Sequence, residues 1–209
     1  FRRVLFRSCL GWRIGKSLTP MLRLWLIRHF PPAVPPGVCY GQTDLPLLTP
    51  LLEQSGALDR LCEQLPANMA SLPVFSSPLQ RCAELAAQLH PAPIIDARLQ
   101  ELVFGDWELQ TWDAIGPTAL DDWAADIAGF RPPQGETGYE LQQRVLAWLH
   151  DIAINDAEMV VVTHAGVMRA LQAYHQQLQA HQWLSLRYDY GQVLCLDFSA
   201  EQIRATSVQ

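Results

Sequence analysis

The chain has 209 residues, of which 49% are hydrophobic, so it is long enough to bury one well-filled core. Its formal net charge of −6 argues against general binding to nucleic acid or to an anionic membrane, although a few converging arginines can still hold a small anion. No apolar run approaches the roughly 18 residues that a membrane-spanning helix needs.

The cysteines are odd in number and form no CxxC pair. The five are Cys9, Cys39, Cys62, Cys82 and Cys195. This pattern is typical of reduced thiols in a cytoplasmic protein rather than of a disulfide framework. It also lacks the ligand spacing of a zinc site. We therefore expect a cytoplasmic protein without a bound metal.

Residues 1–20 contain several basic residues and no acidic one, and we treat them apart from the fold. Their opening letters, FRRVLFRS, resemble the translation of a sequencing-adapter read, and Met21 stands directly before the first convincing strand. We therefore predict a non-native or disordered extension over 1–20 and a translation start at Met21. The alternative interpretation is a basic organellar presequence.

Strand and helix patterns alternate from Met21 onward. The apolar run 22–27 predicts a short buried strand, and the proline-rich segment 30–47 predicts a loop. Thr49 followed by Pro50 predicts a helix start, because a hydroxyl can cap the first turn and proline suits its first position. The apolar stripe of that helix comprises Leu51, Leu52, Leu58, Leu61 and Leu65.

The middle of the chain continues the alternation. Residues 73–76 predict a second strand, 79–89 a helix, and 94–95 a third, brief strand. The polar and aromatic stretch 107–133 predicts a helical excursion over the edge of the sheet.

The last third of the chain supplies the remaining elements. An amphipathic helix is predicted over 136–152, and the apolar run 159–162 predicts a strand of the type buried in parallel sheets. A helix from Val167 and closing strands over 192–198 and 203–208 complete the pattern.

This alternation is typical of α/β architecture, and no internal repeat or linker divides the chain. We predict a single three-layer domain over 21–209, with a mostly parallel central sheet and helices on both faces. In open α/β sheets ligands bind at the carboxyl ends of the strands. Polar residues that directly follow the predicted strands are therefore candidates for a functional site.

Four segments place such residues at the end of a predicted strand or the start of a helix. They are LIRH with Arg28 and His29, FSSPLQRC with Arg81, LQELVFGDWE with Glu101, and VVVTHAG with His164. Each residue alone is weak support for catalysis, since a lone arginine is usually solvated and a lone histidine usually makes a local hydrogen bond. Their joint order and flanking letters favour a common site.

Together the four segments resemble the histidine phosphatase superfamily, which has the phosphoglycerate-mutase-like fold. The resemblance runs from about Leu22 to the C-terminus. Within the family, the strings YGQTDLPL, FGDWE and PQGET most resemble the small α-ribazole-5′-phosphate phosphatases of cobalamin assembly.

The resemblance implies a role for each candidate residue. His29 is the expected nucleophile, which forms a phosphohistidine intermediate. Arg28 and Arg81 present planar sets of donors to the phosphate oxygens, and His164 donates to another oxygen. Glu101 is expected to protonate the leaving oxygen and then to take a proton from the attacking water. This chemistry needs fixed donors more than a metal or cofactor, and we expect neither.

The segment after His29 departs from the family pattern. The family continues with Gly-Glu-Thr and an asparagine shortly after, whereas residues 30–32 here are Phe-Pro-Pro. A hydroxyl and an amide that donate to phosphate are therefore missing. Gln42, Thr43 or a backbone N–H near Gly41 are the candidates to replace them, with Gln42 assigned to phosphate binding.

Other acidic residues compete with Glu101. Asp106 or Glu108 could be the true acid, and Glu101 would then be a capping carboxylate. Glu136, in the string PQGET, either lies near the substrate entrance or belongs to the first turn of its helix, where a carboxylate suits the helix dipole.

Three tryptophans surround the excursion that follows Glu101. The favoured interpretation is that Trp107, Trp112 and Trp123 pack this segment onto the sheet. The alternative is that one or two of them form an aromatic wall for a planar leaving group such as a benzimidazole nucleoside.

The expected function is a metal-independent phosphomonoesterase that acts on a small cytosolic phosphate ester, with α-ribazole 5′-phosphate as the favoured substrate. The alternatives are a phosphoglycerate mutase and a catalytically impaired phosphate-binding module. The expected partner is a small-molecule phosphate ester, with no nucleic acid and no membrane. A homodimer is compatible with the sequence.

Overall fold

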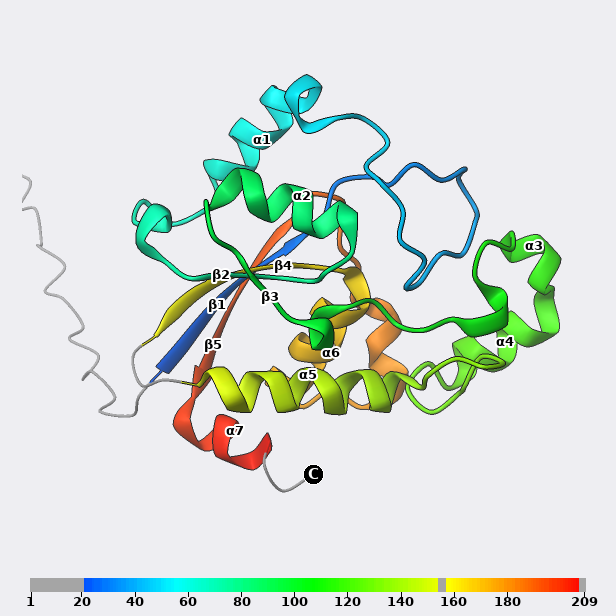
Figure 1. The fold of residues 1–209 in the computed structure, drawn as a ribbon. Coiled ribbons are helices and arrows are strands. Elements are labelled where there is room, and N and C mark those ends of the chain that lie inside the picture. Colours follow the sequence, from blue (N-terminus) through cyan, green and yellow to red (C-terminus); the bar gives the residue numbers. More distant parts are fainter. Residues whose placement is uncertain (1–20, 154–156, 207–209) are drawn as a thin grey trace, which may run out of the picture.

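The computed structural model describes residues 21–153 and 157–206 (Figure 1). The N-terminal extension predicted over 1–20 lies outside the described residues and stays a prediction. No helix in the described ranges is long and apolar enough to cross a membrane.

A five-stranded sheet forms the centre of the fold, in the order β3-β2-β4-β1-β5. The strands are β1 (Met21–Arg28), β2 (Val74–Ser76), β3 (Ile94–Ile95), β4 (Glu158–Thr163) and β5 (Val193–Ser199). Neighbouring strands are parallel except for β5, which pairs antiparallel with β1. The predicted three-layer α/β fold with a mostly parallel sheet is therefore confirmed.

The central strands are apolar because both of their faces are covered. In β4, the residues from Met159 to Thr163 are all buried. Helices α1 (Ser55–Cys62) and α2 (Gln80–Leu89) lie on one side of the sheet, above it in Figure 1. Their buried side chains include Leu61 and Leu85, which pack in one cluster with residues of β1, β2 and β4.

The predicted start of the helix near residue 50 is wrong in its detail. The Thr49 side chain does not cap it, and a short 3-10 helix over Leu51–Gln54 precedes α1. The side-chain amide of Gln54 donates instead to the carbonyl oxygen of Thr49. The proline therefore begins a tight 3-10 turn, and the regular helix starts only at Ser55.

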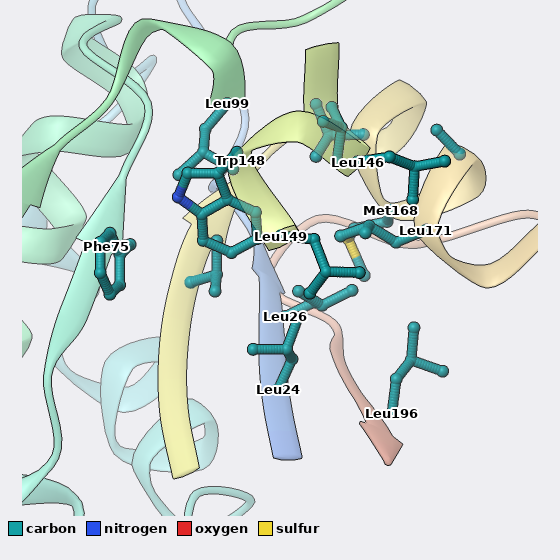
Figure 2. Close-up of a cluster of buried hydrophobic side chains, with 14 of the residues drawn as sticks. Leu24, Leu26, Phe75, Leu99, Leu146, Trp148, Leu149, Met168, Leu171 and Leu196 are labelled. Atoms are coloured by element: carbon teal, nitrogen blue, oxygen red, sulfur yellow. The ribbon is translucent and has the colours of Figure 1, made fainter. Parts of the chain in front are cut away.

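The opposite side of the sheet carries α5 (Gly138–Ile152) and α6 (Ala165–His175). Figure 2 shows Trp148 of α5 beside Phe75 of β2, with ring centroids 5.6 Å apart. Leucines of β1 and Met168 of α6 complete this larger cluster. Thr137 caps the N-terminus of α5 and forms a capping box with Glu140.

The excursion between Glu101 and α5 contains two short helices, α3 (Trp112–Ile115) and α4 (Pro117–Ala125). The rings of Trp112 and Trp123 stack at 6.3 Å, which ties the two helices together. Trp107 is buried and stacks on Phe130 at 5.7 Å. These contacts agree with the packing interpretation of the tryptophans.

The closing strand predicted over 203–208 is wrong. Residues from Ala200 to Ala205 form the helix α7, and 207–208 lie outside the described residues. Ser199 at the end of β5 forms a capping box with Gln202, which starts a helix where the apolar letters alone favoured a strand. The remaining 3-10 helices are Met69–Ser71, Ala97–Leu99, Gly105–Trp107 and Ala180–Ser185.

Candidate active site

Three neighbouring parallel strands carry the predicted residues to one edge of the sheet. In the register of β1 against β4, Arg28 pairs with Thr163, so His29 and His164 both follow directly at the carboxyl end. Strand β2 pairs with the other side of β4 and leads into α2, which contains Arg81. The rings of His29 and His164 are 5.1 Å apart, centroid to centroid.

His29 is held as a neutral imidazole with one nitrogen free. Its side chain is buried, and its Nδ1–H donates to the carbonyl oxygen of Phe30 at 2.6 Å. Burial, together with the charges of Arg81 and, to a lesser extent, of Arg28, lowers the pKa of His29 to about 3 against the opposing effect of the hydrogen bond. The Nε2 lone pair is therefore available at neutral pH.

His164 is also buried, at the N-terminus of α6. Its Nε2 lies 2.8 Å from the hydroxyl of Ser77 and 3.4 Å from the sulfur of Cys82. Burial lowers its pKa well below the usual value, and the charge of Arg81 acts in the same direction. The ring is therefore neutral and fixed by two side chains.

Arg28 lies across the ring of Tyr190, with its guanidinium carbon 3.8 Å from the ring centroid. Its Nη1 donates to the carbonyl oxygen of Tyr188 at 2.5 Å. Its Nε is buried and has no hydrogen-bond partner among the described residues. The guanidinium is thus held in place and retains free donors that an anion can use.

Arg81 is completely buried, although it is charged. Its Nη2 donates to the carbonyl oxygen of Gly41 at 2.6 Å, and its Nη1 donates to that of Thr43 at 2.8 Å. Its Nε finds no partner within the described part of the chain. Arg81 therefore fastens the loop that follows β1 and keeps one donor unused.

Glu101 and Glu108 differ in what their carboxylates bind. Glu101 accepts from the N–H of Leu102 at 2.9 Å and from that of Gly166 at 3.1 Å, which brings it beside the start of α6. Glu108 accepts from the N–H groups of Gln42 and Phe104 and from Thr43. Glu108 thus has the contacts of a loop-organising residue, and Glu101 remains the better candidate for the acid.

Arg144 holds the segment that carries Glu101. Its guanidinium donates to the carbonyl oxygens of Arg98 and Glu101 and forms an ion pair with Glu136 at 2.6 Å. Glu136 precedes the capping residue Thr137, so it lies outside the first turn of α5. Its carboxylate is engaged by Arg144 and by the N–H of Val103.

The side chain of Gln42 lies along the same segment. Its amide nitrogen donates to the carbonyl oxygen of Glu101 at 2.9 Å. This bond uses one of the two amide N–H groups. Direct binding of Gln42 to phosphate stays a prediction.

The Phe-Pro-Pro departure is accommodated by the core. Phe30 is buried, and its ring packs with Leu47, Leu51 and Leu61 rather than in solvent. A Cβ atom on Gly191 would approach the Phe30 ring to 2.6 Å, so the glycine makes room for the phenylalanine. The backbone carbonyl of the same residue anchors the ring of His29.

The sequence from residue 24 to the C-terminus matches a known protein family. A family model described as "Histidine phosphatase superfamily (branch 1)" matches residues 24–209. The chain belongs to the histidine phosphatase superfamily. No curated protein sequence matches it significantly.

Solved structures of histidine phosphatase relatives have the same fold. The protein TTHB049 from Thermus thermophilus is 30% identical, with a TM-score of 0.65, over 83% of this chain and 92% of that one. A putative alpha-ribazole-5′-P phosphatase from Escherichia coli K-12 is 27% identical, with a TM-score of 0.70, over 86% and 92%. A mycobacterial glucosyl-3-phosphoglycerate phosphatase, at 24% identity, a TM-score of 0.70 and coverage of 85% and 90%, shares the fold. The chain is an enzyme of the histidine phosphatase type.

Four residues that contact the predicted site were not singled out from the sequence. Ser77 and Cys82 contact His164, and Tyr40 and Tyr190 lie against the two arginines. Ser77 directly follows a buried strand, which is a usable signal. The tyrosines carry no such signal, because 150 residues separate them in the chain. Among the described residues, no group of three or more His, Cys, Asp or Glu side chains is arranged to hold a metal ion.

Proposed function

We propose that this histidine phosphatase is a metal-independent phosphomonoesterase that hydrolyses a small-molecule phosphate ester through a phosphohistidine on His29. The observation that carries the proposal is the hydrogen bond from His29 Nδ1 to the Phe30 carbonyl, which leaves Nε2 as the nucleophilic nitrogen. The buried Arg81 and the clamped Arg28 flank this ring and supply positive charge for a phosphate dianion.

In the first step, the Nε2 lone pair of His29 attacks phosphorus and the bond from phosphorus to the ester oxygen breaks. Glu101 gives a proton to the leaving oxygen, so the product departs as an alcohol. Arg28, Arg81 and His164 hold the phosphoryl oxygens on which charge develops. In the second step, water gives a proton to Glu101 and attacks phosphorus, and the bond to His29 breaks to release phosphate.

For the substrate, we propose α-ribazole 5′-phosphate, which would place the enzyme in cobalamin assembly in the cytoplasm. The strings YGQTDLPL, FGDWE and PQGET favour this substrate, and a structural relative is named as a putative phosphatase of the same compound. The free cysteines Cys39, Cys62, Cys82 and Cys195 are in keeping with a reducing compartment.

Phosphate release from α-ribazole 5′-phosphate in the presence of EDTA tests the proposal, with His29→Ala as the paired variant. We expect turnover by the natural chain and a loss of about a thousandfold or more in the variant. A quenched reaction of the natural chain should also contain an acid-labile phosphoenzyme. Turnover of an aryl phosphate but not of α-ribazole 5′-phosphate would reject the substrate and keep the phosphatase. Phosphate binding without turnover of either ester would favour an impaired binding module.

A further inference from the structure

A cavity of about 810 Å³ opens beside Arg28 at the candidate site. The proline-rich segment 31–38 forms one wall, and Leu48 and Trp112 contribute apolar surface to the others. Among the described residues that line it, Arg28 alone is charged, and Arg28 is one of the two arginines proposed to hold phosphate. A volume of this size is typical of pockets that enclose a small organic molecule.

Two tyrosines connect this cavity to the phosphate arginines. The hydroxyls of Tyr40 and Tyr190 are hydrogen-bonded at 2.9 Å, and both residues line the cavity. The ring of Tyr190 lies under Arg28 and has its centroid 5.6 Å from that of His29. The ring of Tyr40 lies 5.2 Å from the guanidinium carbon of Arg81. The two tyrosines therefore form an aromatic surface that the cavity shares with both arginines.

Tyr40 is uncharged at neutral pH. Burial raises the pKa of Tyr40 above its usual value, and the hydrogen bond to Tyr190 and the negative charge of Glu101 act in the same direction. The pair thus offers ring faces and hydroxyls on the cavity wall beside Arg28.

Contacts to two other segments hold the proline-rich wall in place. Pro32 forms a β-bridge with Leu47, and Val38 forms one with Thr111. The N–H of Trp112 donates to the carbonyl oxygen of Gly37 at 2.9 Å. Prolines further restrict the backbone of this wall. The cavity therefore exists before a ligand arrives, which reduces the entropy lost on binding.

We infer that this cavity binds an uncharged, ring-containing leaving group, stacked on the surface formed by Tyr40, Tyr190 and Trp112, and that it discriminates against leaving groups with a carboxylate. The inference rests on the proposed function and specifies the substrate class of the same site. An anionic leaving group would have to share Arg28 with the phosphate, since the described part of the chain brings no second cation to the cavity wall.

Three primary alkyl phosphates of similar leaving-group chemistry test this inference on the full chain: ethyl phosphate, 2-phenylethyl phosphate and 2-carboxyethyl phosphate. We expect kcat/KM for the phenylethyl ester to exceed that for ethyl phosphate by about 10- to 100-fold, the range for burial of one aromatic ring. The carboxyethyl ester should be poorer than ethyl phosphate. Equal kcat/KM values for the phenyl and carboxyl esters would overturn the inference while leaving the phosphatase intact.

Two variants connect the preference to the cavity. Trp112→Ala should lower the ratio of kcat/KM for the phenylethyl ester over ethyl phosphate about tenfold. Leu48→Arg adds a cation to the wall at a position that is 63% exposed, so the fold should tolerate it. It should raise the ratio of carboxyethyl over phenylethyl ester by about tenfold or more. Ile94→Arg, on the edge strand β3 outside the cavity and 48% exposed, is the matched control and should leave both ratios within about twofold.

Binding of stable phosphonates separates a failure of the inference from a failure of the proposed function. By calorimetry, 3-phenylpropylphosphonate should bind more tightly than methylphosphonate, and Trp112→Ala should reduce that difference. If no ester is hydrolysed but this binding pattern holds, the phosphatase proposal fails and the cavity assignment stands. If esters are hydrolysed and the phosphonates bind equally, the cavity assignment is wrong.

Discussion

The carbonyl oxygen of Phe30 accepts a hydrogen bond from Nδ1 of His29 at 2.6 Å, and this contact sets the chemistry of the imidazole. A carbonyl oxygen can only accept, so the proton must reside on Nδ1. The contact is made by the backbone and is therefore independent of the side chain at position 30. A phenylalanine at this position is therefore compatible with the contact that fixes the tautomer of His29.

The buried histidines predict a protein that loses stability in acid. The pKa of His29 is about 3 in the folded protein and 6.5 in the reference state, so the unfolded chain binds a proton first as the pH falls. Neutral, buried His29 makes its full contribution to the free energy of unfolding above pH 6.5. That contribution is lost progressively between pH 6.5 and 3, by up to about 1.4 kcal/mol per pH unit. The lowered pKa of His164 adds a loss of the same sign.

Urea unfolding at several pH values between about 7.5 and 4 measures this slope. His29→Gln should flatten the decline, because the variant has no imidazole to protonate at this position. The matched control is His181→Gln, at an exposed position, which should leave the slope unchanged. A natural chain as stable at the acid end as at neutral pH would contradict the burial of neutral histidines.

Substitution of the two competing glutamates separates catalysis from loop structure. Glu101→Gln should lower kcat for an alkyl phosphate by about 100-fold or more, and much less for 4-nitrophenyl phosphate, whose leaving group needs no proton. Glu108→Gln should lower thermal stability, because its carboxylate accepts from Gln42, Thr43 and Phe104. Glu108→Gln should change kcat for the alkyl and the nitrophenyl ester by the same factor. A leaving-group dependence in Glu108→Gln would assign the acid to Glu108 instead.

The common position of His29 and His164 at one sheet edge could be predicted better than the segments around it. His29 and His164 follow buried strands directly, so their common edge could be inferred from local patterns and from the parallel arrangement. The helix over 200–205 was missed because Ser199 and Gln202 form a capping box, a signal that apolar periodicity ignores. The Tyr40–Tyr190 contact depends on tertiary packing alone, which no local pattern encodes.

The buried Arg81 predicts a strict requirement for guanidinium. Arg81→Lys keeps the positive charge, but a lysine cannot donate both to Gly41 and to Thr43 while retaining a donor for phosphate. We expect kcat/KM to fall by about 100- to 1000-fold, because one hydrogen-bond donor to the charge of the transition state is lost. The free energy of unfolding should also fall by about 1–3 kcal/mol. Arg23→Lys, in an exposed ion pair with Asp197, is the control and should change each quantity little. Activity of Arg81→Lys within about tenfold of the natural chain would show that phosphate is held elsewhere.

The packing of Phe30 on Gly191 predicts unequal effects of two glycine substitutions. Both Gly37 and Gly191 have positive φ, at +82° and +72°, so alanine at either position costs about 1–2 kcal/mol in backbone strain. A Cβ at Gly37 meets nothing within 4 Å, whereas a Cβ at Gly191 approaches the buried Phe30 ring to 2.6 Å. Gly191→Ala should therefore lose about 1–3 kcal/mol more than Gly37→Ala in urea unfolding. Because the Gly191 N–H donates to the carbonyl oxygen of Arg28 at 3.0 Å, the displaced loop should also disturb phosphate binding. Equal losses of stability in the two variants would mean that Phe30 is not packed against this glycine.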